Sequence, residues 1–354
     1  MGRHLRDISE GLCAKGIDVV LCSPALPDGL QAPVEHIPLD LVRAVSPRAD
    51  LTALRRLARA VRELRPDVVH AHSSKAGAIA RLARASSPHT PVLYTPHGYA
   101  FAGHFDHSGE QLAYRTAERL LAPLATRVVC VCEVEARLAR SIGPAGRVEI
   151  IHNGIAPAGS VVPDARIASL ARSGPVIGAL TMLRPGKGME TLIAALPRVL
   201  AAHPGAQVAI VGDGPDLRDL EQSARALGVA EAVHFLGASS DPLAALSAMD
   251  IFVHPSWAES FPYVILEAMS LARPIVASDV GGVGEAVLDG ESGLLVAPRD
   301  EVALADGLTA LLGDPARAAR LGELALARAR ELFTMDAMVD GLSQLYFDVA
   351  RVDD

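Results

Sequence analysis

The 354-residue sequence has few aromatic residues and no long uncharged hydrophobic segment. Because it lacks a run of about 18 uncharged apolar residues, we expect no membrane-spanning helix. The N-terminal stretch MGRHLRDISEGLCAKG carries charges where a signal peptide has its apolar region, so we expect a cytoplasmic protein. Phe, Tyr and Trp make up 4% of the chain and are not interleaved with basic residues, which argues against nucleic-acid binding.

Cysteine is also scarce. The four cysteines form neither a Cys-x-x-Cys motif nor a Cys/His cluster at the spacing of metal ligands. Structural zinc and disulfide bonds are therefore not expected.

The formal net charge of −8 is unevenly distributed along the chain. Residues 1–172 contain 21 Lys and Arg against 16 Asp and Glu, whereas residues 173–354 contain 12 against 25. A basic first half favours partners that carry phosphate groups or an anionic membrane surface. An arginine-rich surface without a binding role would give the same count, so both interpretations remain open.

Residues 51–65 have leucines and a valine at helical spacing on one side and arginines on the other. This pattern predicts an amphipathic helix. We favour a helix that covers a sheet, and the alternative is a helix that lies in a membrane surface. Peripheral contact with the inner face of the cell membrane would follow from that alternative.

Short apolar runs alternate with helical patterns along the whole chain, which is typical of βαβ units and parallel sheets. A segment rich in Pro, Gly, Ser and Ala at 156–174 predicts an interdomain linker. We expect an α/β protein with two facing Rossmann-like domains and a cleft between them. The predicted parts are a domain over 1–165, a domain over 166–331 and a C-terminal helix over 332–354 that packs back on the first domain. The expected strands are 67–72, 91–97, 127–133, 148–155, 175–183, 206–212, 232–237, 250–255, 274–279 and 293–296.

Two glutamates stand eight positions apart in the stretch ESFPYVILE, at 259–267. Glu259 precedes a predicted helix start at Ser260 and Phe261, where free backbone N–H groups favour an anion such as a diphosphate. Glu267 lies inside an apolar run, and a buried carboxylate needs a partner. A pair of sugar hydroxyls would supply one.

Polar residues gather at two predicted strand ends in the first half. His70 and His72 alternate along one strand and point the same way, next to Lys75. Ligands of open α/β sheets bind at the carboxyl ends of the strands, so His72 and Lys75 are candidates for the acceptor side. His97 ends the next strand, where a satisfied structural histidine is the alternative.

A resemblance to a known family begins with residues 250–287, which read DIFVHPSWAESFPYVILEAMSLARPIVASDVGGVGEAV. This segment resembles the E-x7-E signature of the family-4 retaining, nucleotide-sugar-dependent glycosyltransferases of the GT-B fold. Around it, in the family's order, stand TMLRPGKGMETLIAAL, VAIVGDGP, HFLG and IIHNGI. The first half is similar through DVVHAHSSKAG and YTPHGYAF, a form seen in members that build bacterial capsules and exopolysaccharides. The resemblance covers nearly the whole chain.

The resemblance implies roles in donor binding and catalysis. Glu259 would contact the hydroxyls of the transferred sugar, and Glu267 would hold the ribose of the nucleotide. Lys187 would neutralise the diphosphate leaving group, where negative charge grows during transfer. Ser260 and Phe261 would belong to the anion-binding helix start. The base would be read by the backbone that ends at Gly237.

The resemblance further places His97 near the sugar and the acceptor. It implies transfer with retained anomeric configuration through an oxocarbenium-like state, as in retaining glycosidases. The sequence has no Asp-x-Asp motif. We therefore expect no metal ligands and no cofactor, with Lys187 and helix N-termini replacing the cation.

Two positions depart from the family pattern. Relatives usually open with a β-strand and a Gly-Gly loop, whereas this sequence begins at the end of that loop, with Gly2 as the remaining phosphate-facing glycine. We expect a first domain without its first strand, either because the start codon is placed too late or because the strand is truly missing. Many relatives have Arg where this chain has Met182, so Arg184 is the candidate to replace it.

The leading hypothesis is a glycosyltransferase that moves a sugar from a UDP-linked donor to a lipid-linked or saccharide acceptor in cell-surface polysaccharide synthesis. A non-catalytic or partner-dependent GT-B subunit is an alternative, suggested by the missing strand and by Met182. A nucleotide-sugar epimerase of the same fold is the third hypothesis.

Overall fold

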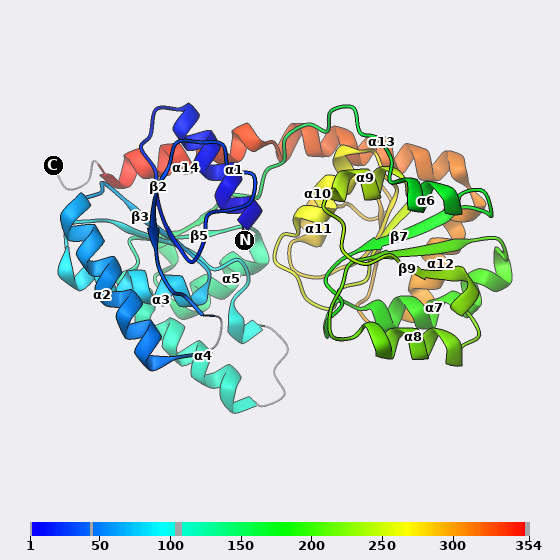
Figure 1. Cartoon of the computed structure of the whole chain (residues 1–354), viewed down its shortest axis with the longest axis horizontal. Helices are drawn as coiled ribbons and strands as arrows, with labels where there is room; N and C mark the ends of the chain where they lie inside the picture. The colour runs from blue at the N-terminus through cyan, green and yellow to red at the C-terminus, as the bar shows by residue number, and fades with distance from the viewer. Residues whose placement is uncertain (1, 43–44, 103–107, 351–354) are drawn as a thin grey trace. The chain divides into compact units, whose positions relative to one another are not determined.

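The computed structural model describes residues 2–42, 45–102 and 108–350 (Figure 1). The chain divides into two compact units: unit 1 consists of residues 1–154 and 335–354, and unit 2 of residues 155–334. The sequence predicts boundaries after residues 165 and 331. Each unit is an α/β structure with parallel strands. Among the helices of the described segments, none combines the length and apolar character needed to span a membrane.

Unit 1 contains a four-stranded parallel sheet in the order β3, β4, β5, β6 and a separate parallel pair of β1 and β2. The register pairs His72 at the end of β3 with Thr95 at the end of β4, so the residues that follow both strands lie at one edge of the sheet. The strands are β1 (Val20–Ser23), β2 (Glu35–Pro38), β3 (Val69–His72), β4 (Val92–Thr95), β5 (Arg127–Cys130) and β6 (Val148–Ile150).

The first and last helices of unit 1 pack against each other and against the sheet. Ile8 of α1 shares a buried cluster with Met338 and Leu342 of α14, and the sheet residues Leu93 and Val129 complete it. The α-helices of this unit are α1 (Gly2–Ala14), α2 (Pro47–Leu64), α3 (Ser74–Ala83), α4 (Ser108–Leu121), α5 (Glu133–Ile142) and α14 (Met335–Ala350). The 3₁₀ turns are η1 (Arg84–Ser86), η2 (Ala100–Ala102), η3 (Ala122–Leu124) and η4 (Ala145–Arg147).

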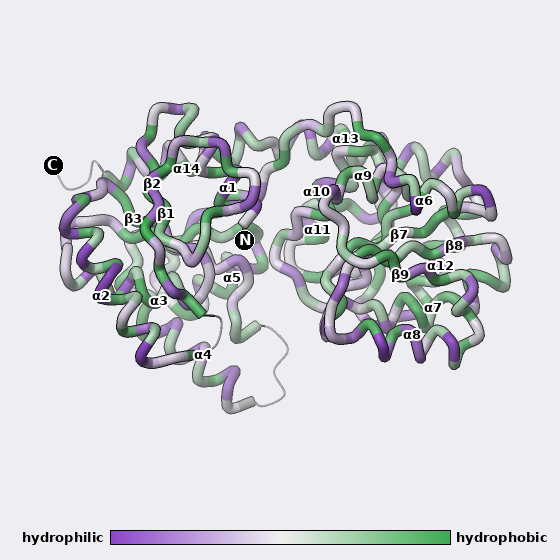
Figure 2. Tube along the Cα trace, viewed as in Figure 1, coloured by the Kyte–Doolittle hydropathy of each residue, from purple (hydrophilic) through white to green (hydrophobic). Residues whose placement is uncertain are grey.

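Helix α2 corresponds to the amphipathic helix expected at 51–65. Green and purple segments alternate along it in Figure 2, in keeping with its mixed hydropathy. Its buried residues are Ala53, Leu57, Ala60 and Val61. Leu51 and Leu64, at the ends of the predicted apolar face, are exposed, because this face rests on the core only over its middle turns.

Unit 2 contains a six-stranded parallel sheet in the order β12, β11, β10, β7, β8, β9. The strands β10 and β11 are buried at every residue, as expected of a parallel sheet that is covered on both faces. The strands are β7 (Val176–Leu180), β8 (Gln207–Val211), β9 (Val233–Phe235), β10 (Ile251–His254), β11 (Ile275–Ser278) and β12 (Leu294–Val296).

Aspartate side chains begin several helices of unit 2. Asp241, Asp300 and Asp314 each accept a hydrogen bond from a backbone amide in the first turn of α9, α12 and α13. The helices of this unit are α6 (Ala165–Leu170), α7 (Met189–Ala202), α8 (Leu217–Ala226), α9 (Pro242–Ser247), α10 (Tyr263–Ser270), α11 (Val283–Ala286), α12 (Glu301–Gly313), α13 (Pro315–Leu332) and the 3₁₀ turn η5 (Ala230–Ala232).

Helix α6 lies inside the segment 156–174 that the composition predicts to be a linker. Asp164 caps it by accepting a hydrogen bond from the amide of Arg166, and Ile167 is fully buried. The amide of Asp164 also donates to the carbonyl of Ala244 at 2.9 Å. The linker prediction is therefore wrong over α6, because one capping residue and one buried side chain suffice to hold a short helix on unit 2.

Candidate active site

The order of the strands in unit 2 reverses between β7 and β10. From β7 the chain proceeds outward through β8 and β9, and it then returns to the other side of β7 to build β10, β11 and β12. The loops that leave β7 and β10 therefore run in opposite directions from neighbouring parallel strands. Ligands of open α/β sheets bind in the crevice that such a reversal leaves at the carboxyl ends. Lys187 follows β7 and Glu259 follows β10, which places both at this position.

Lys187, Glu259 and His254 form a polar cluster at this edge of the sheet. The ammonium nitrogen of Lys187 lies 2.6 Å from Oε1 of Glu259. Nε2 of His254 lies 3.2 Å from the same oxygen, although its orientation falls short of a directed hydrogen bond. The side chains of Lys187, Glu259 and His254 are 17%, 12% and 4% exposed. The nearly buried carboxylate of Glu259 thus contacts the ammonium of Lys187 and the imidazole of His254.

The electrostatics of the cluster keep Glu259 ionised. Burial alone would raise the pKa of its carboxyl group. The contacts with His254 and Lys187 outweigh burial and lower the pKa from 4.5 to about 2. Glu259 is therefore a carboxylate at neutral pH, poised to accept hydrogen bonds from hydroxyl groups.

This lowered pKa predicts how the stability of unit 2 depends on pH. Because the pKa of Glu259 is lower in the folded than in the unfolded chain, the cluster stabilises the protein above about pH 4.5 and loses this effect as the pH falls toward 2. The shift corresponds to a free energy on the order of 3 kcal/mol. We expect the difference in Tm between the wild type and Glu259→Gln to shrink as the pH is lowered from about 6 to about 3.

The control for this experiment is Glu190→Gln, which changes an exposed glutamate at the start of α7. Its Tm should follow that of the wild type at every pH. A difference between the wild type and Glu259→Gln that stays constant over the same range would contradict the prediction.

The loop that carries Lys187 is fastened to the loop after β10. Gly188 has a φ of +70°, and a Cβ atom on it would lie 1.8 Å from the carbonyl oxygen of Pro255. The amide of Trp257 donates to the carbonyl of Gly186 at 2.9 Å. Only glycine permits both the left-handed conformation and the close approach at Gly188. The sequence Gly-Lys-Gly thus presents the lysine at a fixed place.

The loop that carries Glu259 is fastened in the same way to the loop after β11. A Cβ atom on Gly281, which has a φ of +57°, would lie 1.9 Å from the carbonyl oxygen of Glu259. The amide of Gly282 donates to the carbonyl of Ser260 at 2.6 Å. Backbone contacts between three loops therefore set the position of the carboxylate before any ligand binds.

Helix α10 begins directly after these residues, with Pro262 at its N-cap. The aromatic ring of Phe261 is buried and contacts the ring of Phe333, with 5.3 Å between centroids, so this side chain serves packing. Glu267 lies within α10 and is 4% exposed. Its binding of a ribose, and the anion site at the helix start, stay predictions.

Two further residues predicted for the donor site also belong to unit 2. Arg184 is exposed, and its guanidinium lies 3.5 Å from the carbonyl oxygen of Pro185. Met182 is 57% exposed on the same loop. Gly237, with a φ of +70°, accepts a hydrogen bond from the amide of Gly212 at 2.8 Å and so lies at the carboxyl ends of β8 and β9.

The remaining predicted residues belong to unit 1. His72 and His97 are brought together, with Nδ1 of His72 3.1 Å from Nε2 of His97. The ammonium of Lys75 forms an ion pair with Asp50 at 2.8 Å, and this hydrogen bond lowers the pKa of the Asp50 carboxyl group. Gly2 is the exposed first residue of α1.

A buried glutamate positions the loop that carries His97. Glu135 of α5 accepts hydrogen bonds from the amides of Gly98 and Val131. His97 and Gly98 both have positive φ angles, +52° and +94°. A left-handed conformation costs about 1 to 2 kcal/mol at a residue that is not glycine, so the surrounding structure must impose it on His97.

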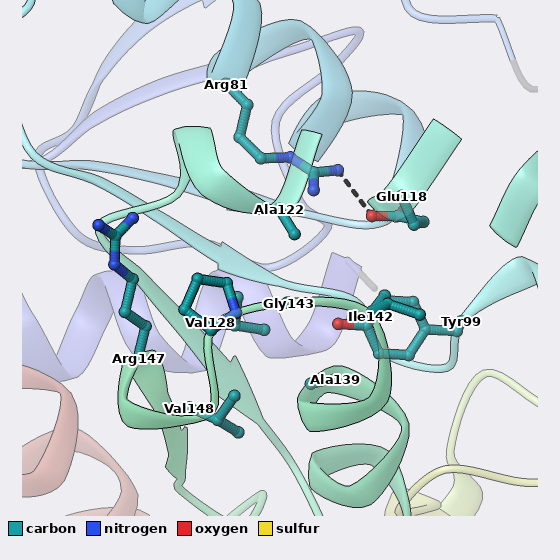
Figure 3. A pocket seen from close by; sticks show the side chains of 11 residues that line it. Arg81, Tyr99, Glu118, Ala122, Val128, Ala139, Ile142, Gly143, Arg147 and Val148 are labelled. Carbon is teal, nitrogen blue, oxygen red and sulfur yellow. Dashed lines mark hydrogen bonds and ion pairs between the residues drawn. The ribbon is translucent and has the colours of Figure 1, made fainter. Parts of the chain in front are cut away.

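A small pocket elsewhere in unit 1 is lined by none of the predicted site residues (Figure 3). At its wall Arg81 of α3 donates to Glu118 of α4 at 2.9 Å, and the hydroxyl of Tyr94 donates to the other oxygen of Glu118 at 2.9 Å. The guanidinium also lies 4.2 Å from the centre of the Tyr94 ring. The ion pair of Arg81 with Glu118 therefore joins α3 to α4.

Sequence reasoning missed His254 as a member of the site. It stands inside the quoted segment DIFVHPS and ends β10. The signal was available, because a polar residue at the carboxyl end of a buried strand is the same pattern that singles out His72.

Comparison with known proteins identifies the family of this chain. Residues 1–154 match a family model described as "Glycosyl transferase 4-like domain", and residues 174–314 match "Glycosyl transferases group 1". A glycogen synthase of Mycobacterium tuberculosis is 30% identical over 394 residues, which cover 99% of this chain and 91% of that protein. A GDP-mannose-dependent mannosyltransferase of Mycolicibacterium smegmatis is 37% identical over 227 residues, 59% of this chain and 58% of that protein.

Two solved structures share the fold over nearly the whole chain. The sucrose-phosphate synthase of Thermosynechococcus elongatus has a TM-score of 0.83 and 25% identity, covering 98% of this chain and 92% of that one. Anabaena HepE in complex with UDP and glucose has a TM-score of 0.82 and 23% identity, covering 98% and 95%. The chain belongs to the family-4 glycosyltransferases of the GT-B fold, which use nucleotide-sugar donors.

Proposed function

We propose that this glycosyltransferase moves a sugar from a UDP-linked donor to a lipid-linked or saccharide acceptor in cell-surface polysaccharide synthesis, with retention of the anomeric configuration. The observation that carries the proposal is the cluster of Lys187, Glu259 and His254 at the strand reversal of unit 2. The complex of HepE with UDP and glucose supports the choice of UDP as the nucleotide of the donor.

Lys187 and Glu259 contact different parts of the donor. The ammonium of Lys187 stabilises the diphosphate as the bond between the sugar and its leaving oxygen breaks. The carboxylate of Glu259 accepts hydrogen bonds from hydroxyls of the transferred sugar. The ammonium of Lys187 has three N–H donors, so it can bind a diphosphate oxygen while it keeps its 2.6 Å contact with Glu259.

Other residues complete the proposed donor site. Glu267 holds the ribose, the backbone at Gly237 contacts the base, and the start of α10 at Ser260 and Phe261 faces the diphosphate. Arg184 is exposed and long enough to add a second positive charge, and Gly2 contributes backbone to the phosphates. With this much positive charge from the protein, the transfer proceeds without a metal ion.

The acceptor enters from unit 1 in this proposal. In this proposal His97, next to His72, acts on the reacting sugar and the acceptor, and Lys75 binds the acceptor after exchanging Asp50 for it. The new bond forms between an acceptor oxygen and the anomeric carbon, and the departing phosphate takes the acceptor proton. Peripheral contact with an anionic membrane would bring a lipid-linked acceptor within reach.

Nucleotide binding by the full chain tests the donor. We expect UDP to raise the Tm by a few degrees and GDP and ADP to raise it less, since a ligand at about 100 times its Kd adds roughly 2.7 kcal/mol to the stability of the folded state. A larger response to GDP would overturn the choice of UDP.

Product analysis then tests the reaction. Incubation with UDP-sugars and a panel of lipid-linked and saccharide acceptors should give a product whose anomeric coupling in NMR matches that of the donor. Inverted product would overturn retention. Binding of nucleotide without turnover would favour the partner-dependent subunit, and an epimerised donor formed without acceptor would favour the epimerase.

A further inference from the structure

Three histidines from three separate elements meet in unit 1. His4 lies in the first turns of α1, His72 ends β3, and His97 follows β4. One ring nitrogen of each lies within 4.8 Å of the corresponding nitrogens of the other two. The ring centroids of His4 are 5.1 Å from His72 and 4.4 Å from His97. His4 and His72 are buried and His97 is half-buried.

The spacing of these nitrogens approaches that of a tetrahedral metal site. Zinc binds imidazole nitrogen at 2.0 to 2.1 Å, so two ligands of a tetrahedral ion lie about 3.3 Å apart. The nitrogens of His72 and His97 are already 3.1 Å apart. Movement of His4 by no more than about 1.5 Å would bring all three within coordinating distance.

A fourth histidine in the same region serves as an internal comparison. The ring of His70 lies 4.2 Å from that of His72. Its Nδ1 lies 2.6 Å from the hydroxyl of Tyr346 and its Nε2 lies 2.8 Å from that of Thr95, so both nitrogens have partners on the fold. Nδ1 of His72 and Nε2 of His97, by contrast, form a hydrogen bond with each other, so an ion that takes both lone pairs has to replace this one hydrogen bond.

The supporting structure holds two of the three ligands in place. His70 packs on His72, and the loop of His97 is held in its left-handed conformation by Glu135 through the amide of Gly98. Metal sites depend on such supporting contacts to orient their ligands. A backbone conformation that costs free energy at His97 is consistent with a functional position.

We propose that His4, His72 and His97 bind one divalent transition-metal ion, Zn²⁺ or an ion of similar preference for imidazole, and leave a fourth position open. Each histidine supplies one lone pair as a neutral imidazole. One of the two nitrogens in the hydrogen bond between His72 and His97 carries a proton. When the ion enters, this proton moves to the other nitrogen of the same ring, so both imidazoles stay neutral. The fourth position takes a water molecule.

This proposal departs from the absence of metal ligands that the sequence predicts. It does not make the ion a cofactor of the proposed transfer. Where His97 acts on the acceptor side, which rests on the proposed function, a bound ion would occupy its lone pair and inhibit transfer. Metal binding itself is independent of that function and is measured without an acceptor.

The test uses the metal-free full chain and Zn²⁺ alone, by isothermal titration calorimetry. The variants are His4→Gln and His97→Gln, and the matched control is His89→Gln, an exposed histidine of the same unit. We expect one equivalent to bind to the wild type and the control, and each of the other two variants to bind more than about 100-fold more weakly, since even changes to supporting residues weaken metal sites by 10- to 100-fold.

Two outcomes would overturn the proposal. One is a wild type that binds no stoichiometric Zn²⁺, and the other is a pair of variants that keep the affinity of the control. Circular dichroism of the metal-free variants shows whether they fold. If they do not fold, the visible spectrum of Co²⁺ added to the wild type tests the site. Tetrahedral nitrogen ligation of Co²⁺ gives intense bands. The weak bands of hydrated Co²⁺ would contradict the proposal.

Discussion

Replacing Lys187 by methionine is expected to lower kcat for sugar transfer by about 100- to 1,000-fold, the loss that follows when one preorganised group is removed from a developing negative charge. The lysine is fixed by Gly186 and Gly188, so its charge stands ready before the donor binds. The matched control is Lys15→Met, which removes a surface lysine directly after α1 that pairs with Asp340. Steady-state kinetics with a saturating donor measures both variants.

The same substitution also removes the partner of Glu259, so a structural effect has to be separated from a chemical one. In the double variant Lys187→Met with Glu259→Gln, no unpaired carboxylate remains near His254. We expect its Tm to recover toward that of the wild type while kcat stays low. If kcat of Lys187→Met stays within threefold of the Lys15→Met control, or about 0.6 kcal/mol in the barrier, the role of Lys187 at the diphosphate is wrong.

Replacing Glu118 by leucine is expected to destabilise the chain by about 3 to 5 kcal/mol, which corresponds to a Tm lower by roughly 10 °C. Arg81 would keep its charge, because a guanidinium does not lose its proton in proteins. Its side chain is 1% exposed, so the charge would have neither a carboxylate nor water as a partner. Calorimetry of the full chain measures the shift.

The matched control is Glu63→Leu, which breaks the exposed pair of Glu63 with Arg59 on α2. Exposed pairs contribute about 0 to 1 kcal/mol. The double variant Arg81→Met with Glu118→Leu should recover much of the loss, since a well-packed apolar pair often replaces a buried ion pair without cost. An effect of Glu118→Leu no larger than that of the control would contradict the prediction.

Ten strands could be predicted from the sequence, and the structure confirms each of them within a few residues. They make up the four-stranded and six-stranded sheets, where most strands are short apolar runs that stand out against amphipathic helices. The pair β1 and β2 was missed. β2 reads Glu-His-Ile-Pro and has no apolar run, whereas β1 lies in the short apolar run Val-Val-Leu-Cys at 19–22 and was recognisable from the sequence.

The sequence could predict those residues of the candidate site that directly follow the ends of strands. Lys187 and Glu259 stand 72 positions apart in the sequence, and only the parallel pairing of β7 with β10 makes them neighbours. The ion pair of Lys75 with Asp50 and the meeting of His4 with His72 and His97 depend on how helices lie against strand ends. Hydrophobic periodicity places the elements but contains no information on these contacts.

The position of α14 has a consequence for how the protein is made. Unit 1 contains the first residues of the chain, yet Met338, Leu342 and Val349 of α14 fill its core beside Ile8 of α1. A ribosome synthesises α14 after all of unit 2, which is continuous in the sequence. During translation the second unit can therefore finish folding while the apolar surface of the first unit is still uncovered, because α14 has not yet been made.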